Sequence, residues 1–277
     1  MKKILGIILA ATAIACGPKD GEYTFHLLTT NDVHGHYFDS LYVQPQVRGS
    51  LMSVSAYVDS LQGEWGRENV ILVDAGDYLQ GDNAAYYFNF VDTVSVHLYA
   101  RMVDYIGYDA VVVGNHDIET GHPVYDRISS QMKTPMLAAN ARHASDGNPY
   151  FKEYVILKRH GLKIAVIGCT NPNIGNWLSP ELWSGMEFKN LLPYAQEVVD
   201  RVREQEKPDV VVLAAHTGSG EGNGKYLENQ GLDLFKSLKG VDFVVCAHKA
   251  CSVRGLDSIV VDECVECLHQ LCADALL

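Results

Sequence analysis

Five short polar motifs bring together carboxylate, amide and imidazole side chains, the groups that bind divalent cations. They are Asn31-Asp32-Val33-His34, Asp74-Ala75-Gly76-Asp77, Gly114-Asn115-His116-Asp117, His216-Thr217-Gly218 and Ala247-His248. Their oxygen and imidazole donors, without thiolate, favour Mn, Fe, Zn or a Mg-like ion. The candidate ligands are Asp32, His34, Asp77, Asn115, His216 and His248. One ion needs three or four protein ligands, so this set predicts two ions about 3.5–4 Å apart that share a carboxylate.

Each motif comes directly after an apolar run. The runs 23–30, 69–73, 110–113, 210–215 and 241–247 are rich in Val, Ile and Leu and are short, which predicts buried strands. Loops at the carboxyl ends of strands line the functional crevice of α/β sheets, so we expect the five motifs to converge. Asp77 is the predicted shared ligand, because Gly76 beside it lets the backbone approach an ion closely.

Segments with helical spacing alternate with these strands. Apolar residues recur at helical intervals within 51–61, 94–106, 194–202 and 227–238. A further apolar run at 163–168 joins the segment before it in a predicted hairpin around Arg159-His160-Gly161. The pattern predicts an α/β fold, with a mixed sheet or a sandwich of sheets between helices.

The first residues have the pattern of a targeting segment. Lys2 and Lys3 precede a short apolar run, and Ala13-Ile14-Ala15-Cys16 resembles a bacterial lipobox. We expect a lipoprotein signal peptide over 1–15, lipidation of Cys16 and a tether over 16–22. The alternative is a soluble signal peptide with an incidental cysteine. Either way the chain is expected to be exported; a lipid anchor would hold it to a bacterial membrane, in the periplasm or at the cell surface.

Net charge and cysteine spacing disfavour some classes of partner and metal site. The chain of 277 residues carries a formal net charge of −12, which disfavours nucleic acid polymers as partners. Cys264-Val265-Glu266-Cys267 has no second pair at zinc-ribbon spacing, so a structural zinc is not expected. Cys169 and Cys246 lie in apolar runs and are expected to be small core residues.

The order of the motifs, each after a strand, resembles the calcineurin-like metallophosphoesterase superfamily over about residues 23–249. Thr29-Thr30-Asn31-Asp32-Val33-His34-Gly35-His36 is similar to its 5'-nucleotidase and 2',3'-cyclic phosphodiesterase branch. The resemblance implies a four-layer α/β/β/α sandwich, here over 23–277. It also implies that one metal takes Asp32, His34 and Asp77, and the other Asp77, Asn115, His216 and His248. His116 would be catalytic, with Asp117 orienting its imidazole.

The resemblance further implies hydrolysis of small phosphate monoesters, nucleotides first among them, by a water that two metals activate. A 2',3'-cyclic nucleotide phosphodiesterase and a non-catalytic lipoprotein that retains the fold are the alternatives. Two features depart from the family. We expect the chain to lack the C-terminal domain that clamps the base in the family, so base selection would be missing or supplied by a separate chain. Ala250 stands where the family has a second imidazole after His248, so the first metal is expected to bind more weakly.

Overall fold

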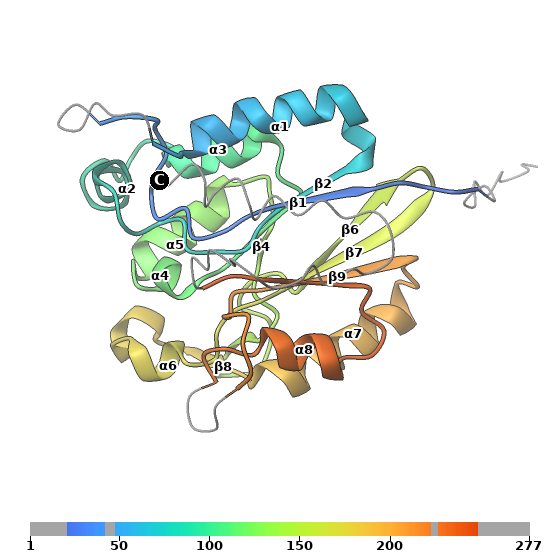
Figure 1. Ribbon diagram of the computed structural model, residues 1–277. Helices are drawn as coiled ribbons and strands as arrows, with labels where there is room; N and C mark the ends of the chain where they lie inside the picture. Colours follow the sequence, from blue (N-terminus) through green and yellow to red (C-terminus); the bar gives the residue numbers. More distant parts are fainter. Residues whose placement is uncertain (1–20, 42–47, 223–226, 249–277) are drawn as a thin grey trace, which may run out of the picture.

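The computed structural model describes residues 21–41, 48–222 and 227–248 (Figure 1). The strands are β1 (His26–Thr30), β2 (Val70–Asp74), β3 (Ala110–Val112), β4 (Met136–Leu137), β5 (Ala141–His143), β6 (Tyr154–Arg159), β7 (Leu162–Cys169), β8 (Met186–Phe188), β9 (Val210–Ala215) and β10 (Phe243–Cys246). The α-helices are α1 (Leu51–Trp65), α2 (Asn83–Tyr86), α3 (Leu98–Ile106), α4 (Asn115–Ile118), α5 (His122–Gln131), α6 (Ile174–Trp177), α7 (Leu191–Gln205) and α8 (Gly231–Ser237). Short 3-10 turns span Arg67–Asn69 and Pro180–Trp183, and a π-helical turn spans Tyr87–Val91.

Two four-stranded sheets carry the fold. The first has the order β1-β2-β3-β4, and all its pairings are parallel. The second has the order β10-β9-β7-β6, in which β10, β9 and β7 run parallel and β6 pairs antiparallel with β7. The predicted hairpin is therefore present, with Arg159 paired to Leu162 across its turn. β5 and β8 form a small antiparallel sheet of their own.

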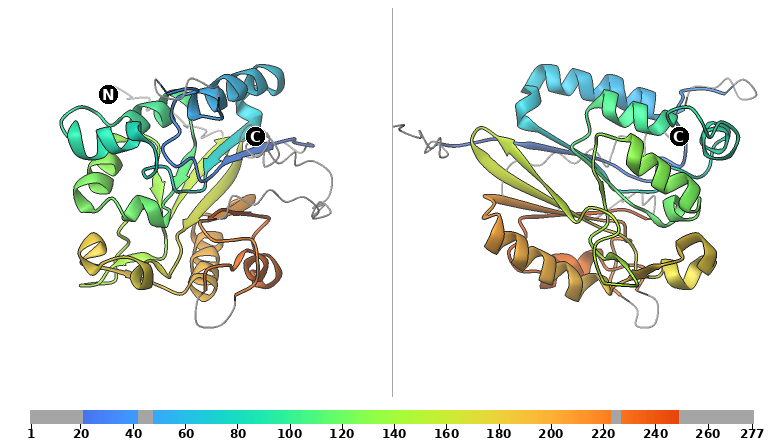
Figure 2. Two further views of the ribbon diagram at one scale, coloured as in Figure 1. Left: turned by 60° about the vertical axis from the view of Figure 1, so that its left-hand side comes forward. Right: turned by 180° about the vertical axis from the view of Figure 1, so that it is seen from behind.

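The sheets face each other and helices cover their outer faces. Residues of both sheets, such as Ile71 and Val112 of the first and Val166 of the second, make one buried cluster between them. Alternate residues of the first sheet, with α1, α3 and α5, form a second cluster, and α7 and α8 pack on the second sheet in a third. Figures 1 and 2 show the resulting order of layers, helix, sheet, sheet and helix, which confirms the predicted α/β/β/α sandwich.

The helix predicted over 94–106 begins four residues later, at Leu98. Asp92 Oδ1 accepts hydrogen bonds from the backbone of Val94 and Ser95, which holds these residues in a turn. The side chain of His97 then caps the helix by accepting from Tyr99 N at 3.1 Å. Local side-chain hydrogen bonds thus outweigh the apolar spacing that extended the prediction to Val94.

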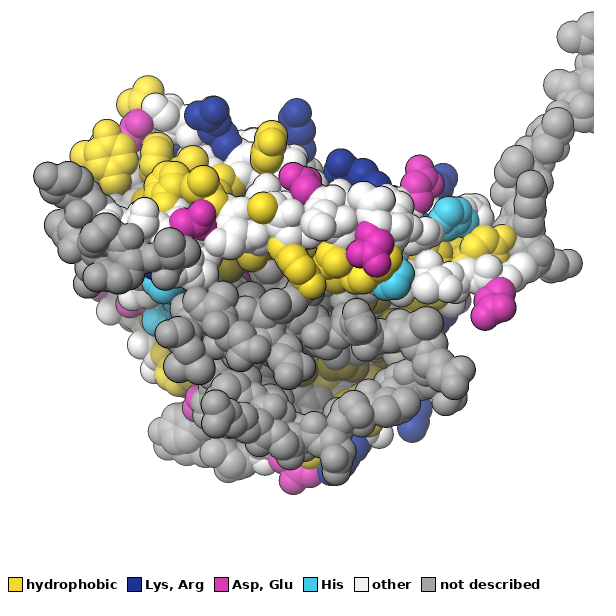
Figure 3. Space-filling model, turned by 45° about the horizontal axis from the view of Figure 1, so that its top comes forward, with side chains coloured by type: hydrophobic (Ala, Val, Ile, Leu, Met, Phe, Trp, Pro, Cys, Tyr) yellow, Lys and Arg dark blue, Asp and Glu magenta, His cyan; other side chains and the backbone are white. Residues whose placement is uncertain are grey.

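Apolar side chains are exposed around α2 and the turn after it. Figure 3 shows hydrophobic side chains gathered on the side of the molecule where Figure 1 places α2. The exposed residues of this segment are Tyr86, Tyr87, Phe90, Val91, Val94 and Val96. Within the described parts of the chain, no helix is long and apolar enough to cross a membrane.

Candidate metal centre

The five polar motifs meet at the carboxyl ends of strands from both sheets. The loops after β1 and β2 are joined by two backbone hydrogen bonds of 2.9 Å, Asp32 N to Gly76 O and His34 N to Asp77 O. The loop after β10 reaches the first sheet through His248 N, which donates to Asp32 Oδ2 at 3.2 Å. Parallel strands end at the same edge of their sheet, and the facing edges of two sheets here enclose one centre.

The candidate ligands form two groups that share one residue. Asp32, His34 and Asp77 make one group, and Asp77, His216 and His248 make the other; within each, the potential ligand atoms lie within 4.8 Å of one another. Asn115 Oδ1 joins the second group, 3.2 Å from His216 Nε2. A carboxylate common to two clusters of oxygen and nitrogen donors is the arrangement that a pair of divalent cations requires.

The backbone is strained at four of these residues. Asp32, His34, Asp77 and His248 have φ angles of 50°, 46°, 63° and 75°, in the left-handed region that residues with a side chain rarely adopt. Such conformations persist only where surrounding contacts enforce them, and they concentrate at functional sites. Here the hydrogen bonds between the loops hold the backbone in these conformations.

Two glycines allow the loops to approach closely. A Cβ at Gly76, where φ is 104°, would lie 2.6 Å from His216 Nδ1. A Cβ at Gly114 would overlap the carboxylate of Asp77. A side chain at Gly76 would therefore collide with His216 of the second sheet, and one at Gly114 would displace the shared carboxylate.

The charges of the buried groups fit cations. His216 donates from Nδ1 to Ala75 O at 2.8 Å, which turns Nε2 toward Asp77 Oδ2 at 3.0 Å. Burial alone would lower the pKa of His216 and raise that of Asp77, but their mutual attraction reverses both directions. Burial raises the pKa of Asp32 and lowers that of His248, to about 4. The centre therefore keeps His248 neutral, as ligation requires, and stabilises positive charge beside Asp77, where a cation would replace the proton that His216 retains.

His116 lies beside the two groups, and its ring is held by a residue that the sequence motifs did not reveal. Its backbone N donates to Asp77 Oδ1 at 2.8 Å, and its ring centroid lies 5.3 Å from that of His34. Nδ1 lies 2.5 Å from Glu119 Oε2. The prediction that Asp117 orients this imidazole is therefore wrong, since Glu119, three residues further along the chain and directly after α4, faces the ring.

Asp117 instead connects the loop after β2 with the loop before α4 through hydrogen bonds from the backbone of both. Its Oδ2 accepts from Gly114 N and Asp77 N, and its Oδ1 accepts from Tyr78 N and Leu79 N, at 2.7–3.0 Å. The side chain is fully buried, and burial together with the charge of Asp77 raises its pKa to about 6. Asp117 thus positions the loop that carries Asp77. None of these four hydrogen bonds involves the ring of His116.

Several other histidine and cysteine residues lie apart from the ligand groups or outside the described residues. His122 contacts Tyr150, Asp126 and Ser184, in an aromatic cluster away from the ligand groups. Cys169 is buried and Cys246 partly buried, both unpaired. Cys16, Lys249, Ala250 and the Cys264–Cys267 pair lie outside the described residues.

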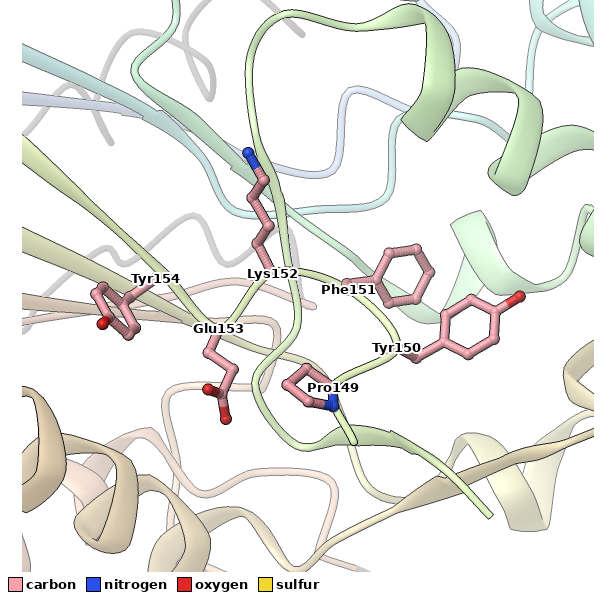
Figure 4. A pocket seen from close by; sticks show the side chains of 6 residues that line it. All are labelled: Pro149, Tyr150, Phe151, Lys152, Glu153 and Tyr154. Carbon is pink, nitrogen blue, oxygen red and sulfur yellow. The ribbon is translucent and has the colours of Figure 1, made fainter. Parts of the chain in front are cut away.

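A hollow of about 390 Å³ opens on another part of the surface (Figure 4). One continuous stretch lines it: Pro149, Tyr150, Phe151, Lys152, Glu153 and Tyr154. Glu153 Oε1 is already engaged by Arg142 and Arg201, each at 2.6 Å. The hollow contains none of the candidate ligands.

Two more residues of the centre gave no sequence signal. The indole of Trp177 stacks on the imidazole of His248, and Glu228 Oε1 lies 3.6 Å from His248 Nε2. Neither belongs to a polar motif after a strand. Glu119, in contrast, could have been found, because residues three apart on a helix are neighbours.

Comparison with known proteins agrees with this geometry. The family model of calcineurin-like phosphoesterases matches residues 25–252. Protein UshA of Salmonella pullorum is 32% identical over 234 residues, which cover 82% of this chain and 40% of that protein. A 5'-nucleotidase of Vibrio cholerae is 26% identical over 259 residues, 90% of this chain and 45% of its own. The chain therefore spans less than half the length of these curated relatives.

Solved structures share the fold. Calcineurin-like phosphoesterase YfkN from Bacillus subtilis superposes with a TM-score of 0.74 at 23% identity, over 85% of this chain and 75% of that chain. A 5'-nucleotidase precursor from Thermus thermophilus superposes with a TM-score of 0.65 at 22% identity, over 86% of this chain and 44% of that chain. The family match across most of the chain and the shared fold place this protein in the calcineurin-like phosphoesterase family.

Proposed function

We propose that this chain hydrolyses phosphate monoesters, with nucleotides as the expected substrates, and that two divalent cations are required. The observation that carries the proposal is the position of Asp77, which belongs to both groups of ligand atoms while His116 lies beside it. The proposed first site consists of Asp32, His34 and Asp77, and the second of Asp77, Asn115, His216 and His248. Relatives named as 5'-nucleotidases support the choice of substrate.

The chain's own residues would do the following. The ligand loops hold their side chains in place at the carboxyl ends of the strands, where the reacting phosphate would bind, because hydrogen bonds from neighbouring loops enforce their strained backbones. Glu119 orients the ring of His116 through Nδ1, which leaves Nε2 to protonate the leaving ester oxygen as the P–O bond breaks. When bound, a pair of divalent cations supplies neutralisation of the phosphoryl charge and a more acidic attacking water.

A substrate panel tests the proposal. Phosphate release is measured from 5'-nucleotides, 2',3'-cyclic nucleotides and p-nitrophenyl phosphate, with added Mn²⁺ or Zn²⁺ and with a chelator. We expect release from the monoesters only with metal, and none from the Asp77→Asn variant. Release from cyclic nucleotides alone would instead favour the phosphodiesterase alternative. A metal-loaded protein that releases nothing from any ester would favour the non-catalytic one.

We also propose that the chain is exported and anchored through a lipid on Cys16, after removal of residues 1–15. The lipobox-like Ala13-Ile14-Ala15-Cys16 supports this. Labelled palmitate should enter the wild-type chain in bacteria and fail to enter Cys16→Ser; equal labelling would contradict the anchor.

A further inference from the structure

Trp177 covers one face of a candidate ligand. Its indole and the imidazole of His248 are stacked, with ring centroids 5.2 Å apart and an angle of 6° between the planes. Trp177 is the last residue of α6, after β7, whereas His248 follows β10. The two rings therefore come from loops 71 residues apart in sequence that lie together at the edge of the second sheet.

His248 needs such a contact because no regular element orients it. β10 ends at Cys246, and His248 has a φ of 75°. Its Nδ1 lies 3.2 Å from His216 Nε2 within the second ligand group. A rotation of the ring would carry Nδ1 away from that group, and a flat ring stacked on its face opposes the rotation.

The loop that carries Trp177 is itself anchored to the second sheet. Trp177 N donates to Asn173 O at 3.0 Å, and Asn173 N donates to Asn171 Oδ1, also at 3.0 Å. Asn171 Nδ2 in turn donates to Glu228 O at 3.1 Å, in the segment whose carboxylate faces His248 Nε2. The loop that carries the indole is thus joined to the segment of Glu228, whose carboxylate also faces the ring of His248.

We propose that Trp177 is a positioning residue for His248, which its indole holds in the orientation that presents Nδ1 to the second cation. The inference rests on the proposed function in one respect, the role of His248 as a ligand. Trp177 acts through His248 and needs no contact with the substrate.

A thermodynamic cycle on metal affinity tests this. The Kd of Mn²⁺ is measured by calorimetry on the metal-free wild-type chain, Trp177→Leu, His248→Ala and the double variant. We expect Trp177→Leu to weaken one of two bound ions by about 2- to 10-fold, the equivalent of one aromatic stacking contact, and Trp177→Phe to weaken it less. In the His248→Ala background, Trp177→Leu should change nothing more.

Trp65 provides a matched control. Its indole also stacks on a histidine, His26, with ring centroids 3.9 Å apart and an angle of 13° between the planes, but His26 is no candidate ligand. Trp65→Leu should leave the Mn²⁺ affinity unchanged. The melting temperature of each variant in chelator shows whether it is folded. If Trp177→Leu is not folded, Trp177→Phe takes its place in the cycle.

Fluorescence gives an independent measurement. The chain has three tryptophans, so Trp65→Phe with Trp183→Phe leaves Trp177 as the sole one. Zn²⁺ should change its emission until the second site is filled, and the change should vanish in the additional variant His248→Ala.

The outcomes separate the two claims. Trp177 has no positioning role if His248→Ala weakens metal binding but Trp177→Leu does not. The same conclusion follows if Trp177→Leu weakens metal binding as much in the His248→Ala background as in the wild-type chain. If His248→Ala itself leaves both metal affinities unchanged, the ligand assignment under the proposed function fails instead.

Discussion

At the scale of single residues, two neighbouring carboxylates, one in α4 and one directly after it, have different tasks. Asp117 turns inward to four backbone N–H groups, while Glu119 turns toward the ring of His116. Glu119 and His116 are both partly exposed at the site, so their pairing serves orientation rather than stability. The proton donor and its support therefore behave as a unit.

We expect His116→Ala to lower kcat by about 10²–10⁴-fold on an ester with a poor leaving group, the range for a lost general acid. Glu119→Ala should lower it by about 10- to 100-fold, as for other supporting residues. The double variant should be no slower than His116→Ala, because Glu119 acts through the ring.

Steady-state rates on an alkyl phosphate and on p-nitrophenyl phosphate measure both effects, which should be smaller for the better leaving group. Asp126→Ala is the control, since Asp126 faces His122 in the same way outside the centre. Fully multiplicative losses in the double variant would show that Glu119 does not work through His116.

Asp74 adds a pH dependence to stability. The side chain is buried and accepts hydrogen bonds from Thr30 Oγ1 and Gly76 N, and burial raises its pKa to about 8 from an ordinary value of 3.8. Between about pH 4 and 8 the folded chain therefore keeps a proton that the unfolded chain releases. The contribution of Asp74 to stability is present at low pH and lost as the pH rises toward 8.

Urea unfolding in chelator at pH 5, 6.5 and 8 measures this contribution. The free energy of unfolding should fall with pH more steeply in the wild-type chain than in Asp74→Asn, whose amide does not titrate. Parallel pH profiles for the two proteins would contradict the assignment of a neutral, buried carboxyl.

At the scale of elements, the centre depends on loops that follow strands and not on the strands themselves. The loop after β2 and the start of α4 are joined where Asp117 receives hydrogen bonds from both and where Gly114 lets Asp77 approach. The carboxylate of Asp117 therefore fixes the distance between the shared ligand and Asn115.

We expect Asp117→Ala to lower the free energy of unfolding by about 3–5 kcal/mol, because four buried N–H donors lose their acceptor. Asp117→Asn should cost less, since its one amide oxygen can still serve one pair of donors. Denaturant unfolding in chelator provides the measurement, and a loss below about 1 kcal/mol for the alanine variant would refute this role.

At the scale of the whole molecule, the candidate ligands come from two separate sheets. Asp32, Asp77 and Asn115 follow strands of the first sheet, and His216 and His248 follow strands of the second. Bound cations would link the two halves of the sandwich across their shared apolar layer. Metal binding and global stability should therefore be coupled.

Mn²⁺ or Zn²⁺ at about 100 times its Kd should stabilise the folded chain by about 2.7 kcal/mol per site. For a chain of this size each kcal/mol raises Tm by about 2–4 °C. Thermal unfolding with metal and with chelator should thus differ by several degrees in the wild-type chain and hardly at all in Asp77→Asn. An equal shift in both would mean that the metal stabilises the protein elsewhere.

Much of the architecture could be predicted because it depends on local patterns. Apolar runs bounded by polar motifs predict the strands, and the ends of parallel strands meet at one edge for any sequence that forms such sheets. That is why Asp32 and Asp77 could be named together from their positions alone, whereas His216 joins them because the two sheets face each other. Helix starts were less predictable, because a single cap such as His97 overrides the apolar spacing.

The tertiary structure alone decided which side chains support the ligands. The spacing of three residues could have placed Glu119 beside His116, but only the tertiary structure shows that Asp117 turns inward to the backbone N–H groups of the neighbouring loop. Trp177 meets His248 because loops after β7 and β10 share a sheet edge. Residue type and spacing determine what chemistry is available, whereas contacts between distant loops depend on backbone directions that no local pattern encodes.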